Sequence, residues 1–322
     1  MLKRLLNSAK IEFTISPVDP LLIKSGQATV GGVDMSFVRT RRNNGRNEPF
    51  IPGSSLKGVI RSYAEKICRT LKTEPVPVCL PYVTPGKEGQ GEQGQASCGL
   101  RFEEYKKGNG IKDLSSRDAY SYSCPACRTF GSHVFTGRFK SADAYLLSGV
   151  NPSFEIRDGV AIDRITGGAA SGAKYDLEVL VKGDFSTTIE IHNFERWQLG
   201  LIALVLRDME DELIRIGSGT SRGLGRIKAT ISSFTVSYFG SQQSTLTGIS
   251  GQCTDQEKSD YGFANETGGN STLTKSVQKG LRFEHDITAN WKDVLAPAVN
   301  DLTDYIASVQ WPAGITDYTR RR

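Results

Sequence analysis

Residues 73–99 cannot form a hydrophobic core of their own, because they contain four prolines and a GKEGQGEQGQ run. Two cysteines, Cys79 and Cys98, lie in this segment, and the sequence Cys124-Pro-Ala-Cys127 follows it. A C-x2-C pair places two thiolates at the separation that one tetrahedral metal ion requires. We therefore predict a structural zinc site with the four ligands Cys79, Cys98, Cys124 and Cys127, which holds the segment in shape.

Two alternatives to this zinc site stay open. The C-x2-C pair can be two unmetallated thiols or a redox couple, and His133 can supply the fourth ligand instead of a cysteine.

The start MLKRLLNSAKIEF lacks the apolar core of an export signal, which argues against a disulfide framework. The longest run of apolar residues and glycine, Leu199–Leu206, is far short of the roughly 20 residues of a membrane-spanning helix, so we expect a cytoplasmic protein without a membrane partner.

The chain has a formal net charge of only +5, but the excess is concentrated between Met35 and Glu74. This stretch holds nine basic and three acidic residues, and a surface of one sign attracts the phosphates of a nucleic acid. A solvated helix face is the alternative explanation. The nine basic residues are Arg39, Arg41, Arg42, Arg46, Lys57, Arg61, Lys66, Arg69 and Lys72.

The spacing of apolar residues indicates an α+β protein. It predicts strands at 10–18, 135–147, 176–182, 186–192 and 226–236, and helices from a Ser54 or Ser55 N-cap to Leu71, over 195–214 and around 291–309. This order favours a ferredoxin-like core in which two helices cover one face of an antiparallel sheet. We place the core in residues 1–236, with an insertion at about 73–134. A polar linker or mobile loop from Gly240 to about Gly280 is expected in a C-terminal extension over 237–322.

The glycine-rich loop GSGTSRGLGR at 217–226 excludes two kinds of nucleotide site. It lacks the Lys-Ser/Thr ending of a P-loop, and its glycines do not follow G-x-G-x-x-G. Nucleotide hydrolysis and dinucleotide binding are therefore not expected. The glycines do allow a close approach to another backbone or to a phosphate, and Arg222 and Arg226 add positive charge.

Four segments together resemble the RAMP superfamily of CRISPR effector proteins, and most closely the repeated backbone subunits of type III effector complexes. They are GGVDMSFVR at 31–39, IPGSSLKGVIRSYAEKI at 51–67, VAIDRITGGAASGAKYDLEVL at 160–180 and GSGTSRGLGRIK at 217–228. The resemblance implies a modified RNA-recognition core that packs beside other type III effector subunits along a CRISPR guide RNA. The long insertion and the C-terminal extension depart from compact family members and leave the subunit's slot and copy number open.

The resemblance also implies where RNA binds. Residues 162–175 match a thumb hairpin that inserts between nucleotides of the guide and target RNA duplex. Residues 52–61 match the guide-backbone contact, which suits a helix N-terminus because its free N–H groups bind phosphate. The residues expected to bind RNA are Arg39, Arg41, Arg42, Ser54, Ser55, Lys57, Arg61, Arg164, Thr166 and Arg222.

Asp34 matches the position where catalytic backbone subunits carry the aspartate for metal-dependent cleavage of target RNA. The implied reaction is attack of the RNA's own 2′-hydroxyl on the adjacent phosphate, with Asp34 as a ligand of Mg²⁺ or another divalent cation or as proton acceptor. The alternatives are a non-catalytic scaffold, in which Asp34 is a turn residue or an arginine partner, and a metal-stapled enzyme outside this family. Asp163 is expected to be a structural partner of Arg164 or of a neighbouring subunit.

Overall fold

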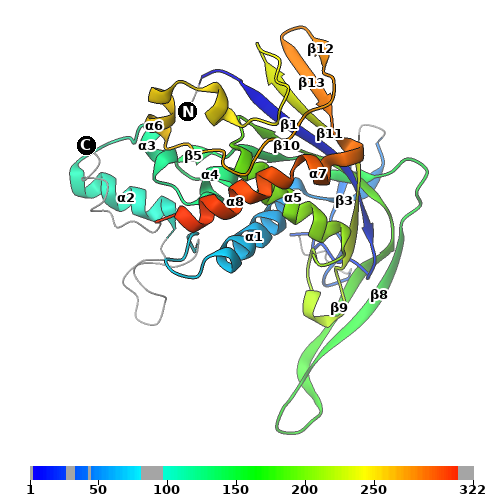
Figure 1. The fold of residues 1–322 in the computed structure, drawn as a ribbon. Coiled ribbons are helices and arrows are strands. Elements are labelled where there is room, and N and C mark those ends of the chain that lie inside the picture. Colours follow the sequence, from blue (N-terminus) through cyan, green and yellow to red (C-terminus); the bar gives the residue numbers. More distant parts are fainter. Residues whose placement is uncertain (1–2, 27–32, 43–44, 81–96, 311–322) are drawn as a thin grey trace.

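The computed structural model describes residues 3–26, 33–42, 45–80 and 97–310, and an antiparallel nine-stranded sheet forms its centre (Figure 1). The strands of the sheet are β1 (Asn7–Pro17), β2 (Arg39–Arg41), β3 (Asn47–Ile51), β6 (Phe139–Ser141), β7 (Ala144–Leu146), β10 (Phe185–His192), β11 (Ile227–Phe239), β12 (Val277–Lys279) and β13 (Arg282–Asp286). Their order is β12-β13-β11-β1-β10-β7-β3-β2, with β6 also paired to β10.

Strand β1 shows why the sheet has one covered face. Its residues alternate between buried and partly exposed, so Ile11, Phe13 and Ile15 face the core while the residues between them face outward. The predicted strand at 10–18 is confirmed. The predicted strand at 135–147 is instead three short strands, β5 (Phe135–Thr136), β6 and β7.

Two long helices pack on the covered face of the sheet (Figure 1). They are α1 (Gly53–Leu71) and α5 (Arg196–Glu210). The apolar stripe of α5 is buried at Trp197, Leu201, Val205 and Met209, because these residues recur at helical spacing. The α+β class that the sequence predicts is confirmed. Its finer ferredoxin-like form stays a prediction.

The C-terminal extension adds a third helix to this layer. Helix α8 (Ala296–Ser308) follows the single turn α7 (Trp291–Val294) and crosses α5 closely, because a Cβ on Gly200 would lie only 2.0 Å from the carbonyl oxygen of Ala298. The residues from Gly240 to Gly280 are also packed: they form α6 (Asp255–Tyr261), η3 (Ile249–Gln252) and β12, and bury Leu246, Ile249, Phe263 and Leu273. The polar linker or mobile loop expected there is instead a packed segment, because Leu246 and Leu273 join the main core while Ile249 and Phe263 pack with Tyr120 of the insertion.

The insertion forms a small helical unit that connects the core to the C-terminal extension. It contains α2 (Cys98–Asn109), α3 (Ser116–Ser121), α4 (Pro125–Phe130) and the short strand pair β4 (Gly131–Ser132) and β5. Tyr120 of α3 donates its hydroxyl to buried Glu195, and Glu195 also accepts the backbone N–H of Ala264 (2.7 Å). One carboxylate therefore joins the insertion, α5 and the extension.

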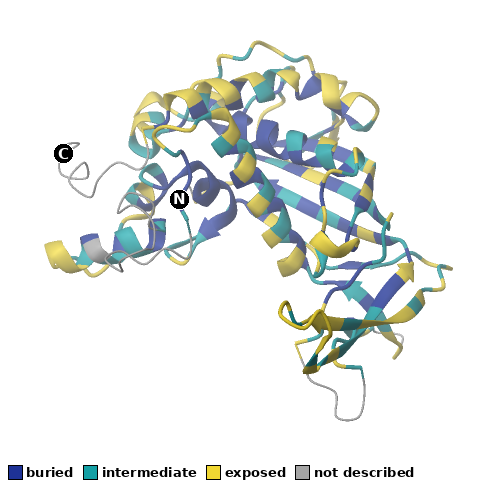
Figure 2. Ribbon diagram, turned by 90° about the horizontal axis from the view of Figure 1, so that it is seen from below, coloured by how far each residue is buried: buried dark blue, intermediate teal, exposed yellow. Residues whose placement is uncertain are grey.

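A hairpin of strands β8 (Ser153–Ile162) and β9 (Ala169–Lys182) projects from the body of the molecule (Figure 1). Figure 2 shows that most of this hairpin is exposed, and its tip residue Ile165 has 95% of its surface exposed. Across the described ranges, no helix combines the length and the apolar character that crossing a bilayer would require.

Candidate nucleic-acid interface and metal centre

Asp34 lies at the root of the β8–β9 hairpin, on the loop before β2. Oxygen Oδ2 of its exposed carboxylate accepts the backbone N–H of Asp176 (3.1 Å). The next residue, Met35, exchanges backbone hydrogen bonds with Asp176 and Glu178 of β9 (both 3.0 Å). The Asp34 loop is thereby fixed to the hairpin. Residues 31–32 of the same motif lie outside the described residues.

Two further carboxylates adjoin Asp34. Asp158 and Asp176 are directly opposite in the β8–β9 register. A hydrogen bond with Asp158 raises the pKa of Asp176, and the charge of Asp34 acts in the same direction. The ammonium of Lys174 lies 3.5 Å from Asp158 and offsets part of this charge. The root of the hairpin therefore presents a cluster of acidic groups that sequence reasoning reduced to Asp34 alone.

Arg39, expected to bind RNA, is directed into the hairpin root. Its guanidinium donates to both carboxylate oxygens of Glu178 (2.6 and 2.8 Å) and lies 4.6 Å from the ring centroid of Phe154. Glu178 also accepts the backbone N–H of Phe37 (2.8 Å). The hydrogen bonds from Arg39 lower the pKa of Glu178. This ion pair is a second attachment of the Asp34 loop to β9.

The other arginines predicted near this loop have different surroundings. Arg41 is exposed at the end of β2, whereas the guanidinium of Arg42 stacks over the ring of Tyr145 at 4.0 Å from its centroid. Tyr145 in turn stacks on Phe50 of the neighbouring strand. The stack holds Arg42 against the outer face of the sheet, so Arg41 and Arg42 point to different parts of the surface.

The tip of the hairpin carries Arg164 and Thr166, both exposed. Asp163 Oδ1 accepts the backbone N–H groups of Ile165 (2.7 Å) and Thr166 (3.2 Å), so it stabilises the tip turn. Asp163 is therefore a structural residue, but its partners are backbone groups rather than Arg164.

The glycine-rich loop also contacts the hairpin root. Arg222, in the short helix η2 (Thr220–Arg222), donates through Nη1 to the hydroxyl of Tyr175 on β9 (2.6 Å). The ring of Tyr175 covers Gly159 on the opposite strand, where an added Cβ would lie 2.2 Å from it. Gly217 adopts a φ of +80° and leaves no room for a Cβ beside the carbonyl of Leu22. The loop thus depends on glycine to approach the backbone of the core.

The start of α1 differs from the expected serine cap. The helix begins at Gly53 after Pro52, whose side chain makes no capping hydrogen bond. Gly53 donates its N–H to Asp143 Oδ1 (2.7 Å), and a Cβ there would lie 2.8 Å from the carbonyl oxygen of Ala142. Ser54 and Ser55 are therefore in the first turn of the helix, where both are exposed.

A groove of about 460 Å³ separates α1 from the segment that leads into the glycine-rich loop. Polar and basic side chains line much of it, and it brings together two of the four sequence motifs. The residues that supply these groups are Ser55, Ser62, Tyr63, Lys66, Arg215 and Thr220. Lys66 and Arg215 escaped the sequence prediction, although Lys66 falls in the basic run.

Lys57 and Arg61, by contrast, are not among the residues that line this groove: Lys57 is directed toward β6 of the sheet, and Arg61 toward the insertion. Lys57 Nζ donates to the carbonyl of Phe139 (3.3 Å), and burial lowers the pKa of Lys57, with neighbouring Arg61 adding to that effect. Arg61 Nη2 lies 3.4 Å from the Sγ atom of Cys127. One side of α1 therefore contacts the cysteine-bearing insertion, while another side lines the groove.

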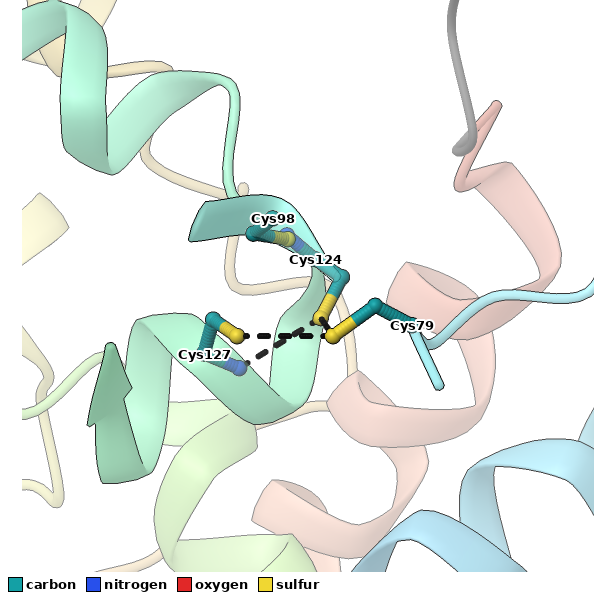
Figure 3. Close-up of side chains that lie close together, drawn as sticks. All are labelled: Cys79, Cys98, Cys124 and Cys127. Atoms are coloured by element: carbon teal, nitrogen blue, oxygen red, sulfur yellow. Dashed lines mark hydrogen bonds between the residues drawn. The ribbon is translucent and has the colours of Figure 1, made fainter. Parts of the chain in front are cut away.

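Four buried cysteines of the insertion converge beside α1 (Figure 3). Their sulfur atoms all lie within 4.8 Å of one another, and Cys79 Sγ is 3.6 Å from both Cys124 Sγ and Cys127 Sγ. A Zn–S bond of about 2.3 Å in a tetrahedron requires S···S distances of about 3.8 Å. The four thiols, including Cys98, are therefore close enough to bind one zinc ion.

Local backbone geometry orients these thiols. Cys124 caps α4 with its Sγ atom, which accepts the N–H of Cys127 (3.4 Å), and Cys98 Sγ accepts the N–H of Cys124 (3.3 Å). Burial raises the pKa of the Cys98 and Cys124 thiols, an effect that a coordinated dication would reverse. His133 is exposed and pairs with Glu103 at 3.7 Å, so it is not the fourth member of the cluster.

A comparison with models of protein families finds a match over more than half of the chain. The model of the RAMP superfamily matches residues 14–228, which include most of the core, the hairpin and the glycine-rich loop. The chain therefore belongs to the RAMP superfamily, and this membership indicates a CRISPR-associated RNA-binding protein. A search of curated proteins finds no match to the chain.

Proposed function

We propose that the chain is a backbone subunit of a type III CRISPR ribonucleoprotein that binds guide RNA and cleaves the paired target RNA. The observation that supports it is that contacts join four distant sequence motifs: two loops meet the hairpin, and one of these loops also meets α1. The Asp34 loop contacts β9 through Asp176, and the glycine-rich loop contacts β9 through the Arg222–Tyr175 hydrogen bond. The same glycine-rich loop forms the groove with α1.

Guide RNA binds, in this proposal, along the groove between α1 and the glycine-rich loop. Lys66 and Arg215 supply positive charge there, and Ser55 and Ser62 supply hydroxyl donors. Such contacts to the phosphate backbone are independent of base sequence, so sequence is read by pairing between guide and target. The exposed hairpin, with Arg164 and Thr166 at its tip, inserts between nucleotides of that duplex.

Cleavage at the hairpin root depends on Asp34. Carboxylate oxygens suit Mg²⁺, so Asp34 with Asp176 or Asp158 would hold the ion, which offsets negative charge on the phosphate when bound. The chain's own part is to fix the Asp34 carboxylate through the N–H of Asp176 and to accept the 2′-hydroxyl proton there. The substrate supplies the nucleophile: its 2′-oxygen bonds to the adjacent phosphorus while the P–O5′ bond breaks, which leaves a 2′,3′-cyclic phosphate and a 5′-hydroxyl that takes its proton from water. The protein needs only to hold the strand in an in-line geometry.

A second function, a non-catalytic scaffold that holds guide RNA, is favoured by one observation. Asp34 Oδ2 already accepts a backbone hydrogen bond from β9, as a turn residue would. In either function the four cysteines bind structural zinc, and this zinc stabilises the insertion against α1.

The deciding experiment is cleavage of labelled target RNA by the assembled guide complex with Mg²⁺. Native protein is compared with Asp34→Ala and with Asp255→Ala, a fully exposed aspartate on α6 as matched control. Loss of one cut in Asp34→Ala alone, with target binding retained, supports the nuclease. Persistence of every cut in Asp34→Ala supports the scaffold, and failure of the native complex to bind target RNA contradicts both functions.

A further inference from the structure

In the described part of the chain, Arg61 is the one arginine of α1 that contacts a cysteine thiol. Its three nitrogens all have acceptors: Nε donates to Glu65 Oε1 (2.9 Å), Nη1 to the carbonyl of Gly131 (3.0 Å) and Nη2 to Cys127 Sγ (3.4 Å). Glu65 is itself buried and lies 3.6 Å from Arg69. The guanidinium is therefore held in one orientation, toward the sulfur.

A dication bound by four thiolates has a net charge of −2, and its burial between helices requires compensation. Arg61 supplies a positive charge to the thiolate of Cys127, and a charge-assisted hydrogen bond is about twice as strong as a neutral one. Without the metal, no ion holds the four sulfur atoms together, so the insertion presents Cys127 Sγ and the carbonyl of Gly131 to Arg61 less firmly. Arg61 therefore binds Cys127 more strongly when the site is loaded.

The other side of α1 forms the proposed RNA groove. Ser62 directly follows Arg61 in the helix, and Lys66 lies one turn further, yet both line the groove rather than the cysteine cluster. Arg69, two turns after Arg61, donates to the backbone carbonyl of Cys79 (3.2 Å). The side of α1 that carries Arg61 and Arg69 is thus attached to the metal site at two points. Because a helix moves as a rigid unit, a shift at these attachments also shifts the groove side of α1.

We infer that Arg61 couples the two sites, so that a divalent metal on the four cysteines and RNA in the groove each favour binding of the other. Arg61 acts as a positioning residue and does not contact RNA. Coupling between two ligands is reciprocal, so zinc and RNA change each other's affinity by the same factor. This inference rests on the proposed function for the RNA arm, whereas its metal arm is independent of RNA.

The test measures zinc affinity with a chelating dye, and affinity for a fluorescein-labelled 20-nucleotide single-stranded RNA by anisotropy, on the full chain with and without zinc. Native protein, Arg61→Met, and Arg61→Lys are compared, with Arg117→Met as matched control. Arg117 is an exposed arginine of the same insertion whose partner is Asp260, not a cysteine. Far-UV circular dichroism and melting report whether each variant is folded.

In native protein we expect zinc removal to weaken RNA binding about tenfold. Arg61→Met should lower zinc affinity by about 10- to 100-fold, as loss of an outer-shell partner of a metal ligand does, and reduce the zinc effect on RNA to below about twofold. Arg61→Lys keeps the charge but not the three-way geometry, so it should behave similarly; this variant carries the test if Arg61→Met does not fold.

Unchanged zinc affinity in the Arg61 variants would overturn the inference. Weaker RNA binding by these variants with a full zinc effect would also overturn it, because Arg61 would then be a direct phosphate contact. If zinc-loaded native protein binds no RNA, the RNA groove is wrong, and the coupling is wrong with it. If in that case only the Arg61 variants have a lowered zinc affinity, Arg61 supports the metal site alone.

Discussion

Asp34 and Asp176 are joined by a 3.1 Å hydrogen bond from the backbone of the second to the carboxylate of the first. The hydrogen bond leaves the charge of Asp34 at the surface while it fixes the orientation of the carboxylate. The same contact is therefore compatible with Asp34 as a structural turn residue and with Asp34 as a catalytic residue. Substitutions that remove the charge but keep the hydrogen bond distinguish these two roles.

Asp34→Asn keeps an oxygen acceptor for the Asp176 N–H but removes the negative charge. We expect Asp34→Asn to retain the melting temperature of the native protein within about 2 °C and to lose cleavage as completely as Asp34→Ala. Thermal melting and cleavage by the assembled complex check this. Native-level cleavage by Asp34→Asn would show that only the hydrogen bond matters.

Lys66 lines the groove and has no ion-pair partner within the described ranges. Lys66→Ala should weaken RNA binding for every RNA sequence alike and reduce the slope of log affinity against log salt by about 1, because one phosphate contact is lost. Binding titrations at several salt concentrations measure the slope. Lys258→Ala on α6, outside the groove, is the control, and an unchanged slope for Lys66→Ala would remove α1 from the RNA path.

Chelation of the metal, or Cys124→Ser, should lower the melting temperature by at least about 10 °C, because binding energy at a four-thiol site is folding energy for the insertion. Metal analysis of the purified protein should find one zinc ion per chain. Cys253→Ser, at a partly exposed cysteine outside the cluster, should leave both measurements unchanged. A protein that contains no zinc contradicts this prediction.

The ion pair of Arg39 with Glu178 predicts a pH dependence. The folded protein holds the pKa of Glu178 below its unfolded value of about 4.3, so the stabilisation is present above that pH and is lost as the pH falls through the folded pKa. Acid should therefore loosen the Asp34 loop from β9. The measurement is hydrogen exchange of the Phe37 amide, which donates to Glu178, relative to reference amides in β1. This relative exchange rate should rise in native protein in acid. It should rise in the same way in Glu178→Gln at neutral pH.

The sequence predicted those parts of the fold that local periodicity determines. The alternation along β1 and the helical spacing in α5 each depend on neighbouring residues, so both elements were found. The contact of Arg61 with Cys127 was not predicted, because the sulfur acceptor lies 66 positions away and the sequence shows only a basic residue on a helix. The pairing of Arg39 with Glu178 spans 139 positions and was missed for the same reason.

The candidate site shows the same division. The four cysteines were predicted as a cluster because the C-x2-C pair Cys124 and Cys127 is a local pattern, and Cys79 and Cys98 precede it in a segment that cannot form its own core. Tyr175, Asp176 and Lys66 were overlooked, since their surroundings are created only when distant loops meet the hairpin and α1. A tyrosine directly before an aspartate in a glycine-rich hairpin was the available signal.

The contact between Gly53 and Asp143 has a consequence for how α1 meets an anion. A helix carries about half a positive charge at its start, and here a carboxylate of the chain already sits on the first N–H. An incoming phosphate therefore gains little from the dipole of α1 and is repelled along its axis. Affinity on this helix is consequently set by side chains on its flank, which makes it adjustable one substitution at a time without altering the backbone.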